Sequence, residues 1–383
     1  MERNKNNLLN KKILLISSWA PPQIGGAQNL YNLFINIDSK DYCILTSENN
    51  LKDSKLGGKS LSCKYYFFKS TKGKLYKFFN ATKIGYKIIK QDKIDMVMGI
   101  SDGGFSFLIT FLLSKITRKP YCIFLFDIWR GNIFAIKNEA VNFFEPIFFK
   151  KAKKILVTNE ATKKYYQEMY AGLDEFEIIH NSTFSNNYEK IGNKKTNNEP
   201  IKVVFTGNIY WPQKDSIINL IKLIKSQKDS NIYLDIYCPN VPKEVMAESE
   251  NNKKIKFLYS SPDEMPKIQS EADILFLPFS WNTDAPDIIK TASPGKLTDY
   301  LIAGRPILIH APEYSFVAKY AKENKFAEVV DVNEISTLRE AILRLATDKD
   351  YSNSLVENAK KTFYKNHNAV DNAKKLVNII NNI

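Results

Sequence analysis

Residues 293–312 read SPGKLTDYLIAGRPILIHAP, a helix pattern followed by a short apolar strand. Ser293 is a residue type that caps helices, and Pro294 is favoured at the first helical position. Gly304 and Pro306 are typical of a helix end, so the pattern predicts a helix of roughly ten residues. The sequence therefore specifies both ends of this helix.

The first turn of this helix has the residue types of an anion-binding site. Three apolar residues at helical spacing are expected to face a sheet: Leu297, Tyr300 and Leu301. Lys296 and Asp299 are left on another side, free for chemistry. Gly295 removes side-chain bulk where backbone N–H groups point outward, and such a helix start attracts phosphate. Because a cation there opposes the helix dipole by about 0.3–1 kcal/mol, Lys296 indicates a bound anion. The alternative is a well-capped surface helix with an incidental lysine.

The same alternation of strand and helix extends along the rest of the chain. Short apolar or β-branched runs in the first half predict buried strands at residues 13–17, 42–46, 96–100, 121–126 and 155–158. The pattern restarts with runs at residues 202–206, 233–237, 256–259, 274–277, 307–310 and 328–330. Because longer helical segments separate these runs, we predict an α/β fold of two Rossmann-like, doubly wound lobes.

A polar segment divides the two halves. Residues 186–199, NNYEKIGNKKTNNE, contain almost no apolar side chains and are predicted to link the lobes. We therefore expect an N-terminal domain at 1–185 and a second domain at 200–350. Residues 351–383 have a helical period that is interrupted near Asn366, so two C-terminal helices are expected, packing back toward the N-terminal domain.

Composition argues against several other classes of protein. The 383 residues are 44% hydrophobic and 13% aromatic, which is enough for two packed cores. Four cysteines lie far apart without CxxC spacing, so neither a zinc site nor a disulfide framework is indicated, and a reducing cytoplasm fits best. Residues 1–17 have a short apolar run without a cleavage site, which predicts a strand rather than a signal peptide. The longest apolar stretch, 105–113, has about half of the roughly 20 residues that a membrane-spanning helix needs.

Residues 272–281, ADILFLPFSW, together with 293–312, resemble the retaining glycosyltransferases of GT-B fold in glycosyltransferase family 4, also called group 1. In that family the helix start binds the donor diphosphate, and an acidic residue on the same helix holds the ribose hydroxyls. The resemblance implies that five residues bind the donor: Ser293, Gly295, Lys296, Leu297 and Asp299. The chain departs from the family at two positions, since Asp299 stands where Glu is usual and Thr291 stands where a second Glu is common.

Two further loops resemble loops of the same family that face the donor. Gly25 and Gly26 follow the first predicted strand, and paired glycines let the backbone approach a ligand at the strand's carboxyl end. In residues 205–214, FTGNIYWPQK, Lys214 matches a lysine that grips the diphosphate, whereas Asn208 replaces the arginine beside it. The alternatives are a tight turn for the glycine pair and a solvated loop position for the lysine.

Asp127 is the candidate catalytic residue. It follows the predicted strand at 121–126, so its carboxylate is expected at the carboxyl edge of the sheet. Some members of the family have an Asp-x-Trp motif near the acceptor, and Asp127-Ile128-Trp129 resembles it. We predict that Asp127 orients or deprotonates the acceptor hydroxyl. The alternative is a structural aspartate that caps the next turn.

No metal or cofactor is expected. The three histidines have no ligand spacing to one another, and they are His180, His310 and His367. The chain also has no GxGxxG fingerprint, which disfavours a dehydrogenase. The nucleotide diphosphate sugar implied by the resemblance is a co-substrate, not a cofactor.

Most of the net charge lies in the first half of the chain. Residues 1–185 contain 28 Lys or Arg against 16 Asp or Glu, which accounts for +12 of the formal +14. Residues 64–93 have nine lysines and one acid, with apolar residues near one helical face. Such a basic amphipathic helix can lie on an anionic membrane surface, and a lipid-linked acceptor would account for its place in this lobe. The alternatives are a sheet-covering helix with solvated lysines, and nucleic-acid binding, which no nucleic-acid motif supports.

Residues and resemblance together predict a metal-independent glycosyltransferase that moves a sugar from a nucleotide-diphosphate donor to a hydroxyl of a glycan or lipid-linked glycan. The N-terminal domain is expected to bind the acceptor and the second domain the donor, and the family implies retention. We expect a role in surface polysaccharide or glycoconjugate synthesis, in the cytoplasm, with peripheral association with the inner face of the membrane. The alternatives are a catalytically silent nucleotide- or glycan-binding protein of the same fold and, less favoured, a basic nucleic-acid-binding protein.

Overall fold

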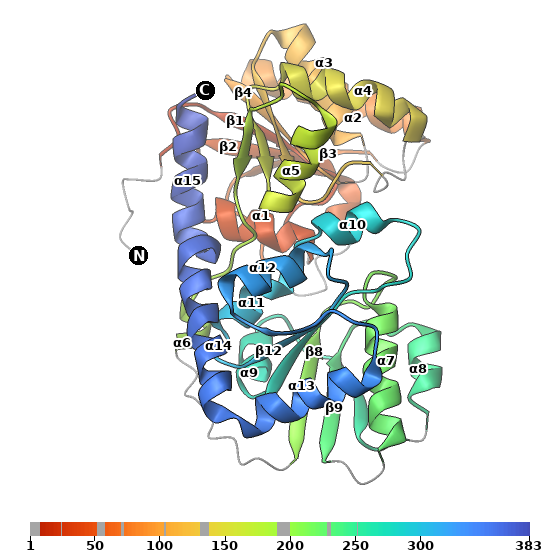
Figure 1. Cartoon of the computed structure of the whole chain (residues 1–383). Helices are drawn as coiled ribbons and strands as arrows, with labels where there is room; N and C mark the ends of the chain where they lie inside the picture. The colour runs from red at the N-terminus through yellow and green to blue at the C-terminus, as the bar shows by residue number, and fades with distance from the viewer. Residues whose placement is uncertain are drawn as a thin grey trace. The chain divides into compact units, whose positions relative to one another are not determined.

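The computed structural model describes residues 8–23, 25–51, 58–69, 73–102, 105–130, 138–189, 200–227, 231–250 and 252–383. The chain divides into two compact units. The first lobe comprises Met1–Ser182 with Ala369–Ile383, and the second lobe comprises Thr183–Asn368. Each lobe has a sheet of parallel strands covered by helices (Figure 1), which confirms the predicted fold class.

The first lobe is built on a seven-stranded sheet in the order β3-β2-β1-β4-β5-β6-β7. Its strands are β1 (Ile13–Ile16), β2 (Tyr42–Ser47), β3 (Lys64–Phe68), β4 (Met96–Ile100), β5 (Tyr121–Leu125), β6 (Ile155–Val157) and β7 (Phe176–Ile178). Every neighbouring pair is parallel, so the carboxyl ends of the strands share one edge of the sheet. The central strands are apolar throughout and buried, as expected when helices cover both faces.

Helices from both ends of the chain cover this sheet. They are α1 (Gly26–Phe34), α2 (Lys74–Gln91), α3 (Ser106–Thr117), α4 (Asn138–Lys151), α5 (Glu160–Met169) and α15 (Ala369–Asn381), with a short 3-10 helix η2 (Glu48–Leu51). α15 packs against α1. Its Leu376 and Ile380 are fully buried in the same cluster as Leu15 and Phe34, so the last helix of the chain completes the core of the first lobe.

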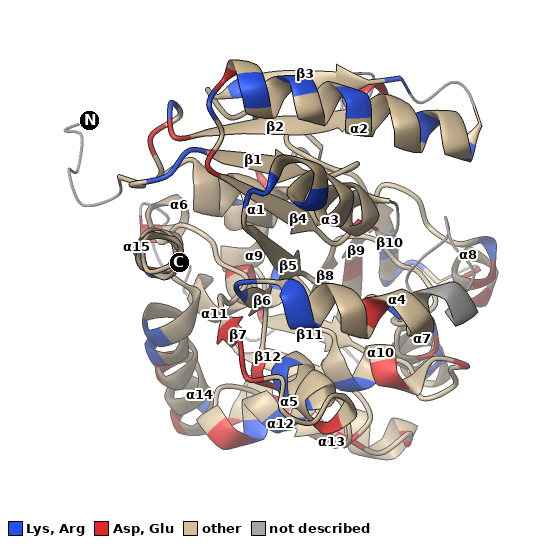
Figure 2. Ribbon diagram, turned by 90° about the horizontal axis from the view of Figure 1, so that it is seen from above, with Lys and Arg blue, Asp and Glu red and all other residues tan. Residues whose placement is uncertain are grey.

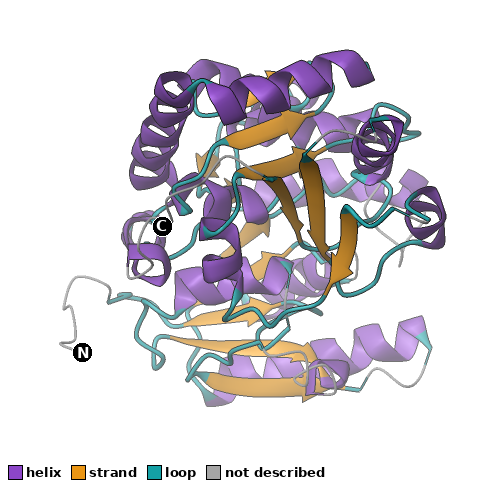
Figure 3. Cartoon of the chain, turned by 90° about the horizontal axis from the view of Figure 1, so that it is seen from below, coloured by secondary structure: helices purple, strands orange, loops and turns teal. Residues whose placement is uncertain are grey.

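The second lobe has a six-stranded parallel sheet in the order β10-β9-β8-β11-β12-β13. Its strands are β8 (Ile201–Thr206), β9 (Ile232–Tyr237), β10 (Ile255–Leu258), β11 (Ile274–Pro278), β12 (Ile307–His310) and β13 (Glu328–Val330). Its helices are α6 (Asn186–Glu189), α7 (Lys214–Ser226), α8 (Lys243–Glu248), α9 (Met265–Ser270), α10 (Pro286–Thr291), α11 (Lys296–Ile302), α12 (Phe316–Asn324), α13 (Ile335–Thr347), α14 (Lys349–Thr362) and the π-helical η4 (Phe363–His367). Figure 3 shows the strands of this sheet with helices beside them.

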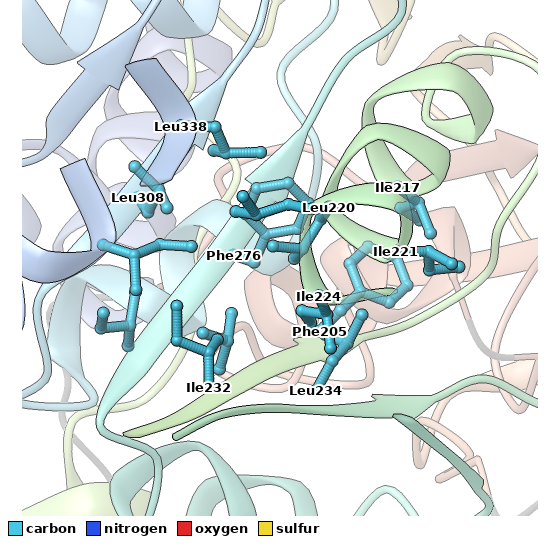
Figure 4. Packing of buried hydrophobic residues seen from close by; sticks show 14 of the residues in the cluster. Phe205, Ile217, Leu220, Ile221, Ile224, Ile232, Leu234, Phe276, Leu308 and Leu338 are labelled. Carbon is cyan, nitrogen blue, oxygen red and sulfur yellow. The ribbon is translucent and has the colours of Figure 1, made fainter. Parts of the chain in front are cut away.

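The core of the second lobe lies between its sheet and α7. Phe205 of β8 and Phe276 of β11 are fully buried, and they share a cluster with Leu220 of α7 and Leu308 of β12 (Figure 4). Truncating a buried phenylalanine to alanine typically costs about 3–5 kcal/mol. This packing holds β8 and β11 side by side, and the loops that leave their carboxyl ends are therefore held close together.

Each predicted strand is confirmed to within one residue at either end. The structure adds β3 and β7, the two outer strands of the first-lobe sheet. β3 is exposed at Lys64 and only half-buried along its middle, and β7 has three residues. Edge strands are buried on fewer sides than central strands, so β3 combines its four aromatic residues with an exposed lysine, and β7 has a glutamate at its centre. The predicted basic helix within 64–93 is α2, which begins at Lys74.

The lobe boundaries differ from the predicted ones. The first lobe ends at Ser182, and α6 lies within the segment predicted as a linker, of which residues 190–199 lie outside the described residues. α14 packs on α11, α12 and α13 of the second lobe, where Leu355 joins the core, whereas α15 packs in the first lobe. The C-terminal helices therefore belong to two lobes, because their apolar faces fill different cores.

Candidate functional site

The residues predicted to bind a donor phosphate lie at the start of α11. The helix begins at Lys296 with Gly295 as its N-cap, so the prediction that Ser293 caps it and Pro294 opens it is wrong. The backbone N–H of Leu297 donates to Pro294 O at 3.0 Å, which forms a tight turn ahead of the helix. α11 is thus seven residues long, shorter than the roughly ten predicted.

The packing face and the end of α11 are confirmed. Leu297, Tyr300 and Leu301 are fully buried, and Gly304 follows the helix with a φ of +72°. The Tyr300 hydroxyl accepts from the backbone N–H of Thr206 at 3.0 Å. Since Thr206 is the last residue of β8, this bond fastens α11 to the carboxyl end of that strand.

The ammonium group of Lys296 is buried and has no hydrogen-bond partner among the described residues. Its nitrogen lies 3.8 Å from the centre of the Phe205 ring, a cation–π contact. Burial lowers the pKa of Lys296 to about 7, because the low-dielectric surroundings disfavour the charged form. An anionic ligand beside this nitrogen would restore its charge and supply the missing hydrogen bonds.

Gly207 forms the wall next to this lysine. Its φ of +109° is a conformation that side chains other than glycine's rarely adopt. A Cβ built on Gly207 would lie 3.2 Å from both Cε and Nζ of Lys296. The turn after β8 and the start of α11 therefore meet at the lysine, and both require the absence of a side chain at residue 207.

Asp299 is not free, contrary to the prediction. Its half-buried carboxylate forms hydrogen bonds with the side chains of Thr183 and Tyr188, and burial raises its pKa to about 6. The Tyr188 hydroxyl also lies 2.6 Å from Gln269 Oε1, and Gln269 Nε2 donates to Thr206 Oγ1 at 3.1 Å. The Tyr188 hydroxyl has a single proton and can donate it to only one acceptor at a time. If a ligand forms hydrogen bonds with the Asp299 carboxylate, Tyr188 can still donate to Gln269.

Lys214 and Asn208 come from the segment that follows Gly207. Lys214 is the first residue of α7, not a loop residue, and it is half-buried. Its side chain forms no ion pair or hydrogen bond with another residue of the described ranges. Asn208 is exposed. Both α7 and α11 therefore begin with a lysine, where the helix dipole disfavours a cation.

Asp215 was missed by sequence reasoning and organises the edge of this site. Its carboxylate accepts from the backbone N–H groups of Trp281 at 2.9 Å and Asn282 at 3.1 Å. These bonds tie the loop after β11 to the first turn of α7. An acidic residue in a first helical turn is common, so its position alone carried no signal for this loop contact.

In the first lobe, Gly25 and Gly26 follow β1 and begin α1. Gly25 is the N-cap of α1 with a φ of +81°, and a Cβ built on either glycine would meet no atom within 4 Å. Conformation, not space, therefore requires a glycine at residue 25. The pair lies where the carboxyl end of β1 meets the helix start, the edge at which open α/β sheets bind ligands.

Asp127 follows β5, two strands from β1 in the sheet, and so lies at the same carboxyl edge. Its side chain is exposed and makes no hydrogen bond or ion pair with another residue in the part of the chain that the structure describes. A cap on the next turn is not observed there. Exposure at the strand's carboxyl end leaves the carboxylate accessible to a ligand.

A buried ionic network fastens the turn that carries Asp127. Glu145 of α4 is fully buried, and its Oε2 lies 2.6 Å from Arg130 Nε and 2.6 Å from the Tyr170 hydroxyl. The Tyr166 hydroxyl lies 3.1 Å from the other oxygen and accepts from the backbone N–H of residue 129 at 2.8 Å. Sequence reasoning missed this glutamate, although one acid within the apolar run FFEPIFF was a usable signal.

The histidines have partners within the protein. One ring nitrogen of each histidine is within hydrogen-bond distance of a side chain: His180 of Glu160 (3.0 Å), His310 of Ser216 (2.8 Å) and His367 of Tyr320 (3.0 Å). Burial lowers the pKa of His310 to about 4, so it is neutral at ordinary pH. Within the described ranges, no group of three or more His, Cys, Asp or Glu residues has the arrangement of a metal site.

The two doubly wound lobes define a GT-B fold, which solved structures of glycosyltransferases share. HepE from Anabaena in complex with UDP-glucose has a TM-score of 0.76 at 11% identity, covering 98% of this chain and 100% of that one. Sucrose-phosphate synthase from Thermosynechococcus elongatus has a TM-score of 0.74 at 12% identity, covering 97% and 98%. WaaG, a glycosyltransferase involved in lipopolysaccharide biosynthesis, has a TM-score of 0.64 at 14% identity, covering 96% and 99%.

Residues 187–362, which lie in the second lobe, match the family model described as glycosyl transferases group 1. This finding confirms the resemblance seen in the sequence at the level of group 1. No curated protein sequence matches the chain significantly. None of the described helices is both long enough and apolar enough to cross a bilayer.

Proposed function

We propose that the protein is a glycosyltransferase that moves a sugar from a nucleoside diphosphate to a hydroxyl of a glycan or lipid-linked glycan, in surface polysaccharide or glycoconjugate synthesis. The group 1 match of the second lobe supports sugar transfer. HepE, which shares the fold, has structures with UDP and with UDP-glucose, which supports a nucleotide-sugar donor. The observation that carries the proposal is the buried ammonium group of Lys296, which has no hydrogen-bond partner among the described residues.

In this proposal the donor diphosphate lies between the turn after β8 and the start of α11. Lys296 and Lys214 supply positive charge from two helix starts, and Gly207 keeps the backbone close. Ser293, Gly295 and Leu297 shape the turn ahead of α11, and Asn208 offers an amide at the exposed side. Asp299 accepts hydrogen bonds from the ribose in place of those it now receives from the protein.

The acceptor hydroxyl is activated by Asp127 in the first lobe. The carboxylate takes the hydroxyl proton while the acceptor oxygen bonds to the anomeric carbon on the same face from which the diphosphate oxygen departs, so that the configuration is retained. Lys296 and Lys214 stabilise the charge that develops on the leaving diphosphate, which is why we propose no metal for this step. Retention rests on the resemblance to family 4. Gly25 and Gly26 let the backbone after β1 approach the donor, since neither position carries a side chain.

Thermal unfolding with UDP, GDP and their sugars tests the donor assignment. A ligand at 100 times its Kd stabilises the folded protein by about 2.7 kcal/mol. Lys296→Met retains the packing on Phe205 and removes the charge, so it should fold and bind the diphosphate about 10–100-fold more weakly. Lys319→Met, an exposed position on α12, is the matched control and should bind as the wild type does. Equal affinity in both variants would show that Lys296 does not hold the diphosphate.

A catalytically silent nucleotide-binding protein is the second candidate. Thr291 stands where the family often has Glu, and its hydroxyl donates to Asp287 O in the same helix at 2.7 Å. Asn208 likewise replaces an arginine of the family pattern. Donor hydrolysis and transfer to a panel of glycan and lipid-linked acceptors separate the two functions. Tight donor binding without any turnover favours the silent protein.

A further inference from the structure

The helices α2, α3 and α4 lie next to one another on the first lobe. α2 and α3 approach closely at Gly85, where a Cβ would lie 2.5 Å from the side chain of Leu113. α3 and α4 meet through Phe111 and Phe148, whose ring centres are 4.7 Å apart. We name these three helices the outer layer. Figure 2 shows Lys and Arg spaced along the whole of α2 in this layer.

The outer layer is strongly basic. Its three helices contain eight Lys or Arg and two acids, and one of those acids is the buried Glu145, paired with Arg130. Basic residues in the last turns of α3 and α4 are favoured by the helix dipole and need no ligand. That argument fails for α2, whose five lysines extend over its full length and begin in its first turn.

Large apolar side chains are exposed in the N-terminal halves of α2 and α4. Leu75 and Phe79 in the first half of α2 are 74% and 64% exposed, and Phe143 in the first half of α4 is 66% exposed. Because each helix follows a strand of a parallel sheet, the starts of α2 and α4 share the carboxyl edge of that sheet. The exposed apolar groups therefore lie along one edge of the sheet. Phe79 and Phe143 contact neighbouring phenylalanine rings, which in turn pack against other rings of the first lobe.

We infer that the outer layer docks on an anionic lipid bilayer. Leu75, Phe79 and Phe143 enter the region between headgroups and acyl chains, while the lysines of α2 face the anionic headgroups. A nucleic-acid duplex offers phosphates to these lysines but no apolar phase to the leucine and phenylalanines. A bilayer surface meets both halves of the pattern. Docking in this way places the carboxyl edge of the first-lobe sheet, with Asp127, next to the lipid surface.

This inference deepens the proposed function, since it selects a lipid-linked acceptor, but vesicle binding itself needs neither donor nor acceptor. The test uses the full-length protein and sedimentation with vesicles of phosphatidylcholine alone or mixed with phosphatidylglycerol. We expect binding only to the anionic vesicles, weakening as salt rises. Lys77→Glu/Lys83→Glu/Lys87→Glu should bind at least about 100-fold more weakly, since neutralising one lysine near an anionic surface already costs roughly fivefold.

Two further variants separate docking from general attraction. Leu75→Ser/Phe79→Ser/Phe143→Ser leaves the charge unchanged, and it should lower vesicle binding at least tenfold because the lost side chains no longer enter the interface. Lys222→Glu/Lys243→Glu/Lys361→Glu makes the same charge change at exposed positions of the second lobe and should bind within twofold of wild type.

Three results would overturn the inference. One is an equal loss of vesicle binding in both lysine variants, and another is unchanged binding in the serine variant. The third is binding to duplex RNA or DNA that is tighter than binding to the vesicles and is lost in the variant Lys77→Glu/Lys83→Glu/Lys87→Glu. Thermal stabilisation by the nucleotide, measured on the same variants, reports on the proposed function separately, because the donor residues lie in the second lobe.

Discussion

Lys296 determines the pH range in which we expect the donor to bind. Its pKa of about 7 lies below its unfolded value, so above pH 7 the folded protein holds a neutral amine there. A diphosphate favours the charged form, and binding should therefore take up a proton. We expect the Kd for UDP to rise roughly tenfold from pH 7 to pH 8.5, while Asp299, with a pKa of about 6, stays ionised throughout.

Isothermal titration in buffers of different ionisation enthalpy measures both the Kd and the proton uptake. Lys296→Met removes the titrating group and should show a flat profile over the same range. A wild-type profile that is equally flat contradicts the proposed contact between this lysine and the diphosphate.

Gly207 is the second position where one residue decides the site. Gly207→Ala forces a side chain into a φ of +109° and against Lys296, so we expect a loss of about 1–3 kcal/mol in unfolding free energy together with weaker UDP binding. Gly172→Ala is the matched control, since Gly172 has a φ of +78° with no atom within 4 Å of its Cβ position. It should lose stability but bind UDP normally. UDP binding that is unchanged in Gly207→Ala would place the diphosphate elsewhere.

At the level of elements, α4 matters to the site through Glu145, which holds the turn after β5 by way of Arg130. Glu145→Gln keeps the shape but removes the charge and leaves buried donors poorly satisfied, so we expect a loss of about 1–3 kcal/mol in urea unfolding. Glu168→Gln removes an exposed pair with Lys164 and should change stability by less than about 0.5 kcal/mol. Similar losses in the two variants would mean that the buried network does not stabilise the lobe.

At the level of the whole molecule, the first lobe is complete only when the last helix of the chain joins it. Leu376 of α15 is fully buried in that core, and Leu376→Ala should lower the unfolding free energy by about 2–5 kcal/mol. Lys375→Ala, exposed on the same helix, should have an effect within about 0.5 kcal/mol. Equal unfolding midpoints for the two variants would show that α15 is not part of the core.

The amino-acid sequence by itself determined the central strands, the apolar face of α11 and the lysine at its start. Buried parallel strands are continuous apolar runs, and a helix face repeats every three to four residues, so both are visible within a few neighbouring positions. Lys296 was recognisable for the same reason, because a cation at a helix start conflicts with a dipole that arises locally.

Only the tertiary structure decided which residues surround these elements. The edge strands β3 and β7, the hydrogen bonds of Asp299 with Thr183 and Tyr188, and the Glu145–Arg130 pair depend on contacts between segments distant in sequence. The lobe that α15 completes also depends on such contacts, since its buried residues pack against α1 and the first-lobe sheet, far away in the sequence. The local sequence pattern indicates that a side chain is buried or paired. Which residue it contacts depends on packing between segments across the whole fold.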